Sequence, residues 1–270
     1  MVQERVRRTS SPGFKFSCQI AIFFLGAGKP LASAAVKGIL WCLHGAVGQA
    51  SDWQGIPVPE WGVKRVDLWR FLACCPMTMP EFGRALNEEA AATSGKRVLV
   101  GYSMGGRLAL HALLEGGSWD AAILVAPHPG LEAEEERALR RAGDAEWGGR
   151  ALEGDWQGFL GAWNGQPVLA GSGKPARAPE IRRREVARSF VDWSLGSQQP
   201  LWDRLEEIKC PVLWCAGERD GKFRALGGRA VDLLTRGELW IAPGAGHRVP
   251  WDVPEAFAAK VGEFLERVIS

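Results

Sequence analysis

Several features that would place this 270-residue sequence in other protein classes are missing from it. No apolar run approaches the roughly 20 residues that a membrane-spanning helix needs, which argues against a membrane protein. The 33 Lys and Arg residues nearly balance the 31 Asp and Glu residues, so the sequence lacks the basic excess typical of a nucleic-acid-binding protein. No metal-binding cluster or phosphate-binding loop occurs, and Gly26 and Gly28 lack the third glycine of a dinucleotide-binding motif. We therefore expect neither a cofactor nor a metal.

Cysteine is present, but without the spacing of a zinc site. The six cysteines form no CxxC pair, and Cys42 and Cys215 lie inside apolar runs, where a free thiol behaves as a small hydrophobic group. Reduced core thiols are typical of a cytoplasmic protein, which is the localisation we expect. Near the N-terminus, arginines precede the apolar residues 20–25, and residues 32–34 imitate a signal-peptidase site. Because that run is short, we interpret residues 1–35 as an extension or hairpin whose role stays open.

The rest of the chain alternates short apolar runs with helix-like segments. This pattern predicts an α/β fold with a mostly parallel sheet and helices on both of its faces. The expected strands cover residues 38–43, 63–67, 97–102, 121–125, 211–216 and 238–241. The expected helices include residues 80–92, 105–114, 223–234 and 254–268.

One long segment departs from this alternation. Residues 131–202 hold no clear strand, are rich in Arg, Glu, Ala and Trp, and contain Gly and Pro breaks. We predict that they form a helical cap inserted into an α/β core made of residues 36–130 and 203–270. Since ligands of such folds bind at the carboxyl ends of the strands, the cap would cover the site.

The strongest motif is the sequence Gly-Tyr-Ser-Met-Gly at residues 101–105. It follows an apolar run and opens a helix-like segment, which is the context in which G-x-S-x-G forms a nucleophile turn. The glycines leave room for a strained turn that exposes the Ser103 hydroxyl at a helix N-terminus, where N–H groups stabilise negative charge. Ser103 is therefore the candidate catalytic nucleophile or base.

Its partners follow in the order serine, acid, histidine that this architecture requires. Asp220 lies in the polar loop after an expected strand, with Glu218 as the alternative acid. His247 lies in a glycine-flanked loop after the last expected strand and is the candidate base, whereas His44 and His111 are interpreted as structural.

An oxyanion hole is also expected beside the serine. The first strong strand ends in Leu-His-Gly-Ala at residues 43–46. The backbone N–H of Ala46 is expected to supply one donor to a developing oxyanion, and that of Met104 the other.

These motifs together resemble the α/β-hydrolase family. Within it, the sequence resembles the 2-succinyl-6-hydroxy-2,4-cyclohexadiene-1-carboxylate synthases over about residues 36–268. Besides the serine and histidine motifs, the matching pieces are Leu-His-Gly at 43–45, His-Pro-Gly-Leu at 128–131, Gln-Pro-Val at 166–168 and the longer run Gly-Glu-Arg-Asp-Gly-Lys-Phe-Arg-Ala-Leu at 217–226. The serine and histidine motifs occur across the whole α/β-hydrolase family, while His-Pro-Gly-Leu and the Gly-Glu-Arg-Asp run are much more specific.

The resemblance implies a lyase of menaquinone or phylloquinone biosynthesis that uses a Ser-His-Asp triad without hydrolysing an ester. Such an enzyme eliminates pyruvate from a succinylated hydroxycyclohexene carboxylate by abstracting a proton. By resemblance, Ser103 acts on the substrate, His247 activates it and Asp220 orients the histidine.

The resemblance also implies the residues that bind this small polycarboxylate substrate. Arg107, Arg140 and Arg188 match arginines that bind carboxylates, a role that suits the bidentate guanidinium. Tyr102 and Trp163 match aromatic positions that line the pocket, although Trp163 could equally serve packing and Arg140 could face solvent.

Two other functions remain open at this stage. A serine hydrolase, either an esterase or a C–C bond hydrolase on a small carboxylate-bearing substrate, would use the same triad. A degenerate hydrolase fold that acts as a ligand sensor or scaffold would need no triad, and the presence of all three candidate residues argues against it. The oligomeric state stays open.

Overall fold

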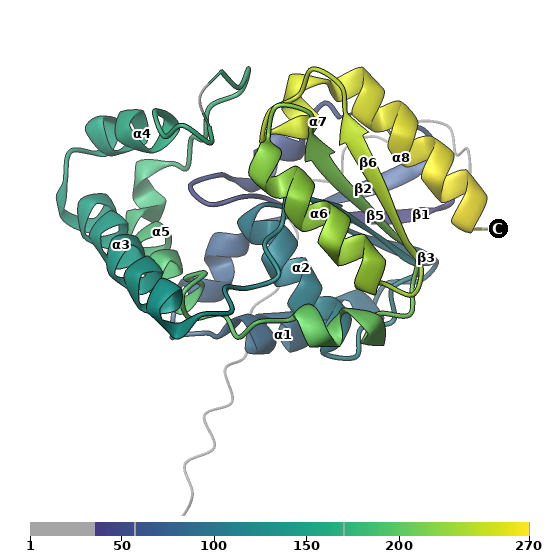
Figure 1. The fold of residues 1–270 in the computed structure, drawn as a ribbon, viewed down its shortest axis with the longest axis horizontal. Helices are drawn as coiled ribbons and strands as arrows, with labels where there is room; N and C mark the ends of the chain where they lie inside the picture. Colours follow the sequence, from purple (N-terminus) through teal and green to yellow (C-terminus); the bar gives the residue numbers. More distant parts are fainter. Residues whose placement is uncertain (1–35, 57, 170, 270) are drawn as a thin grey trace, which may run out of the picture. The chain divides into compact units, whose positions relative to one another are not determined.

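The computed structural model describes residues 36–56, 58–169 and 171–269, which hold a six-stranded sheet (Figure 1). The strands lie in the order β2-β1-β3-β4-β5-β6, and all neighbouring pairs are parallel. They are β1 (Gly38–Leu43), β2 (Trp61–Val66), β3 (Lys96–Tyr102), β4 (Ala121–Val125), β5 (Val212–Gly217) and β6 (Gly237–Ala242). The interpretation of residues 1–35 lies outside the described residues.

All six predicted strands are present, and the α/β prediction is confirmed. The bounds of β1 and β4 are as predicted, and those of the other strands differ by one or two residues. Every residue of β4 is buried, as expected for a central parallel strand covered on both faces. The strand β2 lies at the edge, where its Lys64 and Arg65 can face solvent.

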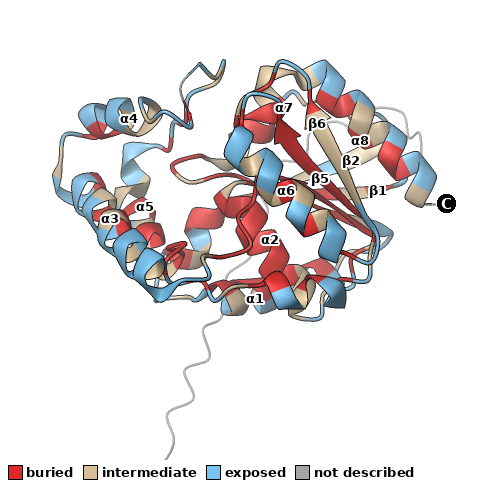
Figure 2. Cartoon of the chain, in the orientation of Figure 1, coloured by how far each residue is buried: buried red, intermediate tan, exposed pale blue. Residues whose placement is uncertain are grey.

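Helices cover both faces of the sheet. On one face, α1 (Met79–Ala91), α2 (Met104–Leu114) and α6 (Gly221–Leu233) contribute to a core that includes Phe82 and Leu108. On the other face, α8 (Pro254–Val268) contributes Phe257 and Phe264 to a second core. Figure 2 shows that burial is concentrated in the inner strands and in α2. The two cores fix the strand ends, and with them the loops that carry the functional residues.

The chain between β4 and β5 is helical. It contains α3 (Glu134–Glu153), α4 (Trp156–Asn164), the short η3 (Glu180–Arg182) and α5 (Arg183–Asp192), and no strand among its described residues. The helices α3 and α5 pack against each other, beside the sheet (Figure 1). The described residues nevertheless belong to one compact unit, so the division into a core and a separate cap at residues 131–202 stays a prediction.

Short helices complete the connections: η1 (Ala50–Trp53), η2 (Leu68–Leu72), η4 (Trp202–Glu207) and α7 (Val249–Asp252). Cys42 and Cys215 are buried and unbonded to another cysteine, which confirms their assignment to the core. Among the described residues, no helix is long and apolar enough to cross a membrane, and no group of His, Cys, Asp and Glu gathers that could hold a metal ion.

Candidate active site

Ser103 lies in a strained turn between β3 and α2. Its φ of 51° and ψ of −111° are sparsely populated for a residue with a side chain. Its backbone N–H donates to the Val125 carbonyl oxygen at 2.8 Å, which ties the turn to β4. Added Cβ atoms on Gly101 and Gly105 would lie 2.5 Å from carbonyl oxygens, those of Gly105 and Leu43 respectively. The glycines are therefore needed for the tight turn that presents the Ser103 hydroxyl.

Ser103, His247 and Asp220 lie in one hydrogen-bonding chain, as the sequence predicted. The Ser103 Oγ is 3.2 Å from His247 Nε2, and His247 Nδ1 is 2.7 Å from Asp220 Oδ2. His247 and Asp220 are only 5% and 8% exposed, so their interaction is largely shielded from water. The geometry allows the imidazole to accept the serine proton while the carboxylate stabilises the resulting positive charge.

Local backbone structure orients the carboxylate. Asp220 caps the N-terminus of α6, where its Oδ1 accepts a hydrogen bond from the Phe223 N–H at 3.3 Å. The alternative acid, Glu218, instead accepts from the Gly244 N–H at 2.9 Å and forms no bond to His247. The structure thus selects Asp220 of the two.

The two expected oxyanion donors lie beside Ser103. Ala46 and Met104 line the same cavity as Ser103 and His247. Met104 is the first residue of α2, so its N–H has no partner within the helix and lies at the positive end of the helix dipole. Ala46 follows β1 in a turn that includes Val47 at a positive φ of 56°. These positions suit a developing negative charge at the serine.

A cavity of about 400 Å³, here called the main cavity, opens at Ser103. The N-terminal turns of α2 and α6 and nearby loops line one part of it, and α3, the end of α4 and the segment after α4 line another. The lining contains three cationic side chains, Arg107, Arg140 and Lys222, and one carboxylate, Asp144. The net positive charge of this lining favours an anionic ligand.

Arg107 is buried in the main cavity without an acidic partner. It is 8% exposed, and its guanidinium donates to the Trp193 carbonyl oxygen at 2.8 Å and to Gln198 Oε1 at 3.2 Å. No ion pair within the described residues includes it. Burial, reinforced by Arg140, lowers the pKa of Arg107 to about 9, and a bound carboxylate would offset this destabilisation of the cation.

Arg140 also lines the main cavity, and Asp144 holds its guanidinium through one hydrogen bond. Its Nε donates to Asp144 Oδ1 at 2.8 Å, and the Asp144 side chain is buried. Its neighbours Arg137 and Arg141 both pair with the exposed Glu134. Arg140 is therefore distinguished from the rest of this arginine-rich helix by its place in the cavity lining.

Arg188 lies elsewhere, which corrects the expectation that it joins the other arginines at Ser103. It extends from α5, donates to the Leu72 carbonyl oxygen at 2.7 Å and lies 3.7 Å from Asp192. It lines a separate surface hollow together with Cys74 and does not belong to the lining of the main cavity. The reason is the packing of α5, which points this position towards η2.

Trp163 lines the main cavity, as the resemblance implied, whereas Tyr102 lines a smaller hollow beside it. The Tyr102 ring is buried beside His247, with ring centroids 5.5 Å apart, and a Cβ on Gly45 would lie 2.6 Å from it. Trp163 lines the main cavity and also packs edge-on against Trp147 at 5.2 Å. It therefore serves packing and pocket shape together.

The other histidines are poorly suited to carry protons. His44 contacts the Gly45 carbonyl oxygen and the Leu68 N–H, so the backbone occupies both ring nitrogens. His128 lines the main cavity, but burial and the neighbouring cations lower its pKa to about 3, which leaves it neutral at pH 7. Burial likewise lowers the pKa of His111 to about 3, in agreement with a structural role.

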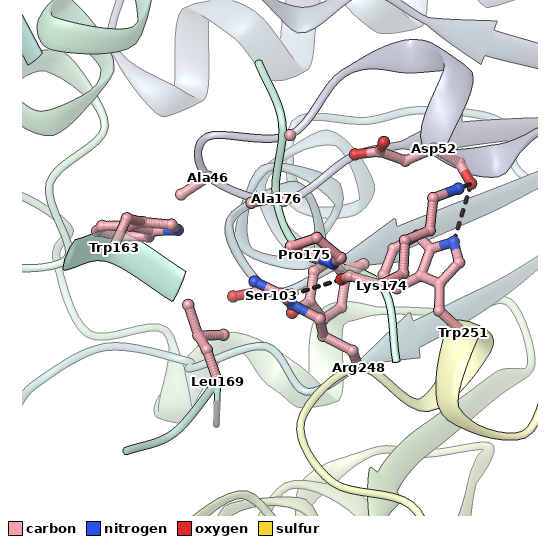
Figure 3. Close-up of a pocket in the computed structure, with 13 residues that line it drawn as sticks. Ala46, Asp52, Ser103, Trp163, Leu169, Lys174, Pro175, Ala176, Arg248 and Trp251 are labelled. Atoms are coloured by element: carbon pink, nitrogen blue, oxygen red, sulfur yellow. Dashed lines mark hydrogen bonds between the residues drawn. The ribbon is translucent and has the colours of Figure 1, made fainter. Parts of the chain in front are cut away.

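A smaller hollow, here called the side lobe, contains residues that sequence reasoning missed. Its volume is about 40 Å³, and its lining includes Lys174, Arg248, Trp251 and Asp52 (Figure 3). It shares four residues with the main cavity, namely Ala46, Ser103, Trp163 and Leu169. The position of Arg248 directly after His247 was the only sequence signal for it. Nothing in the sequence indicated Lys174.

Three comparisons place this arrangement among known proteins. A family model described as the alpha/beta hydrolase family matches residues 42–260. The chain is 30% identical over 253 residues to the 2-succinyl-6-hydroxy-2,4-cyclohexadiene-1-carboxylate synthase of Pectobacterium atrosepticum, covering 88% of this chain and 98% of that protein. The synthase of Serratia proteamaculans is 30% identical over 241 residues, covering 84% and 92%. The solved structure of MenH from S. aureus superimposes with a TM-score of 0.79 at 21% identity, covering 88% and 97%.

Proposed function

Because this chain belongs to the α/β-hydrolase family and, within it, to the 2-succinyl-6-hydroxy-2,4-cyclohexadiene-1-carboxylate synthases, we propose that it is a lyase of menaquinone or phylloquinone biosynthesis. The proposed reaction eliminates pyruvate from a succinylated hydroxycyclohexene carboxylate and leaves a conjugated diene. The substrate is a small molecule with several carboxylates, which suits the cationic lining of the main cavity.

The proton transfer follows from the hydrogen-bonding chain. His247 Nε2 accepts the proton of Ser103 Oγ, and the serine oxygen removes a proton from a ring carbon of the substrate. The electron pair of that C–H bond forms the new C=C bond while the C–O bond to the enolpyruvyl group breaks. The departing enolate takes up the proton from the imidazolium and leaves as pyruvate. Asp220 keeps the hydrogen of the imidazole on Nδ1 and stabilises its charged form.

The groups around Ser103 bind the substrate carboxylates and stabilise the negative charge that develops in the reaction. The N–H groups of Ala46 and Met104 are assigned to the negative charge that develops on a substrate oxygen during proton removal. Arg107 and Arg140 are assigned to substrate carboxylates, which a guanidinium binds through two parallel hydrogen bonds. The lack of an acidic partner at the buried Arg107 is the strongest support for this assignment.

The observation that carries the proposal is the Ser103–His247–Asp220 chain opening into a cavity whose cations outnumber its carboxylate. The test compares two activities of the purified protein. Pyruvate release from the succinylated precursor is followed with coupled lactate dehydrogenase, and p-nitrophenyl ester cleavage is followed in parallel. We expect the wild-type protein to release pyruvate and Ser103→Ala to do so far more slowly. Rapid ester cleavage without pyruvate would instead assign the chain as a serine hydrolase.

The serine hydrolase is the second candidate, because a serine flanked by two oxyanion donors also suits acyl transfer. The same experiment tests the non-enzymatic alternative. If the wild-type protein showed neither pyruvate release nor ester cleavage above the level of Ser103→Ala, a sensor or scaffold role would replace the catalytic one.

A further inference from the structure

Arg248 is a buried cation whose contacts in the structure are all to uncharged groups. Its side chain is 4% exposed, and Nη2 donates to Asn164 Oδ1 at 2.8 Å while Nη1 donates to the Lys174 carbonyl oxygen. The Lys174 ammonium in turn donates to the Asp52 carbonyl oxygen at 2.9 Å. Two cations thus line the side lobe with amide and carbonyl acceptors as their bonded partners (Figure 3).

The carboxylates nearby bond to other groups and form no ion pair with these two cations. The Asp52 carboxylate lines the side lobe, but its Oδ2 accepts from the Gln49 N–H. Asp252 accepts from the Ser172 hydroxyl and from the Gly246 N–H. Among the ion pairs of the described residues, none includes Arg248 or Lys174. A buried charge without a charged partner carries a large desolvation cost, which an anionic ligand would offset.

The side lobe adjoins the reacting hydroxyl. Ser103 lines both the side lobe and the main cavity, and the Tyr102 ring lies at the side lobe. Figure 3 shows Ser103 between Trp163 and Leu169 on one side and Arg248 and Trp251 on the other. With about 40 Å³, the side lobe has room for a terminal carboxylate, whereas the main cavity of about 400 Å³ is large enough for the ring of the substrate.

We propose that the side lobe is a second carboxylate subsite, in which Arg248 and Lys174 bind one short carboxylate arm of the substrate while the ring and its other carboxylates lie in the main cavity. This inference rests on the proposed function and adds to it the number of subsites. The arm is either the enolpyruvyl or the succinyl group, both of which end in a carboxylate. The guanidinium fork carries five N–H groups, which is more than its contacts with Asn164, the Lys174 carbonyl oxygen and the Tyr102 side chain require.

The test uses the full-length protein and four substitutions. Arg248→Gln removes the charge and keeps an amide donor, Arg248→Lys keeps the charge without the fork, and Lys174→Gln removes the second cation. Arg236→Gln is the matched control, because Arg236 is exposed and lines neither hollow. KM and kcat are measured by pyruvate release, inhibition constants are measured with pyruvate and with succinate, and folding is checked by thermal unfolding.

We expect Arg248→Gln to raise KM roughly 10- to 100-fold, which is the loss expected for a charged hydrogen bond. Lys174→Gln and Arg248→Lys should raise KM less, and Arg236→Gln should leave it unchanged. If only pyruvate inhibits Arg248→Gln more weakly than it inhibits the wild-type protein, the enolpyruvyl arm binds in the side lobe. If only succinate does so, the succinyl arm binds there.

Unchanged KM values in Arg248→Gln and Lys174→Gln would overturn the subsite, as would a rise confined to an Arg248→Gln variant with lowered thermal stability. Failure of the wild-type protein to release pyruvate would instead reject the proposed function, so the two failures are distinct.

Discussion

The hydroxyl of Ser103 and Nε2 of His247 lie 3.2 Å apart although 144 residues separate them in the sequence. Parallel strands bring them together, because the turn after β3 and the loops after β5 and β6 leave the same edge of the sheet. The last two loops also touch each other, since the Arg219 N–H donates to the Ala245 carbonyl oxygen at 2.9 Å. A Cβ on Gly217 would lie 2.0 Å from the Gly246 carbonyl oxygen, so glycine permits this approach.

The first prediction concerns the proton-transfer chain. Ser103→Ala and His247→Ala should each lower kcat for pyruvate release by roughly 10²–10⁴, because each removes a group that moves the proton. Asp220→Asn should lower kcat as well, since an amide no longer stabilises the imidazolium. Glu218→Gln is the control and should retain activity, because Glu218 bonds to the Gly244 N–H instead. Wild-type kcat in His247→Ala would contradict the mechanism.

The second prediction compares the contributions of Arg107 and Arg188 to substrate binding. Arg107→Gln should raise KM for the substrate roughly 10- to 100-fold, because a charged hydrogen bond contributes about 1.5–3 kcal/mol. Arg188→Gln should leave KM unchanged, since Arg188 lines a different hollow and bonds to the Leu72 carbonyl oxygen. Steady-state kinetics of pyruvate release measure both. An equal rise in KM for the two variants would mean that the substrate reaches Arg188.

Acid sensitivity should depend on the buried His111. Its ring nitrogens have no hydrogen-bond partner, and burial lowers its pKa from the ordinary 6.5 to about 3. The unfolded chain therefore binds the proton first as the pH falls below 6.5, and stability is lost progressively towards pH 3. Between pH 7 and pH 5, His111→Phe should lose about 2 kcal/mol less unfolding free energy than the wild-type protein.

Urea unfolding of both proteins at the two pH values measures this difference. The contributions of the other histidines cancel in the comparison, because both proteins carry them. Parallel losses of stability in the two proteins would show that His111 is not the group responsible.

The fourth prediction concerns the glycines. In Gly105→Ala the new Cβ would lie 2.5 Å from the carbonyl oxygens of Leu43 and His44, so the turn must shift. We expect a loss of about 1–3 kcal/mol in stability together with reduced kcat. Gly149→Ala, in α3 with nothing within 4 Å of the new Cβ, should instead gain up to about 1 kcal/mol. Thermal unfolding of both variants distinguishes these outcomes, and a stable, fully active Gly105→Ala would contradict the need for glycine there.

Local pattern accounts for the parts of the fold that sequence reasoning placed correctly. The strand β4 is a continuous apolar run, and α8 begins at a proline and carries Phe257 and Phe264 on its buried face, so the bounds of both elements were predictable. The edge strand β2 was placed one to two residues off, at 63–67 instead of Trp61–Val66. Its polar residues gave no clear start, and Asp67 proved to cap η2 by accepting the Trp69 N–H.

In the active site, too, local sequence patterns account for some features and tertiary packing for others. The sequence by itself determined the serine turn and the loops that carry Asp220 and His247, because glycine-containing motifs mark them and the three residues follow one another along the chain in the order serine, acid, histidine. Only the tertiary structure decided which cations face Ser103. It brought Arg107 and Arg140 to the main cavity, added Arg248, and left Arg188 outside. An arginine side chain reaches far from its backbone, and the packing of α3 and α5 sets the direction in which it extends, which no local pattern encodes.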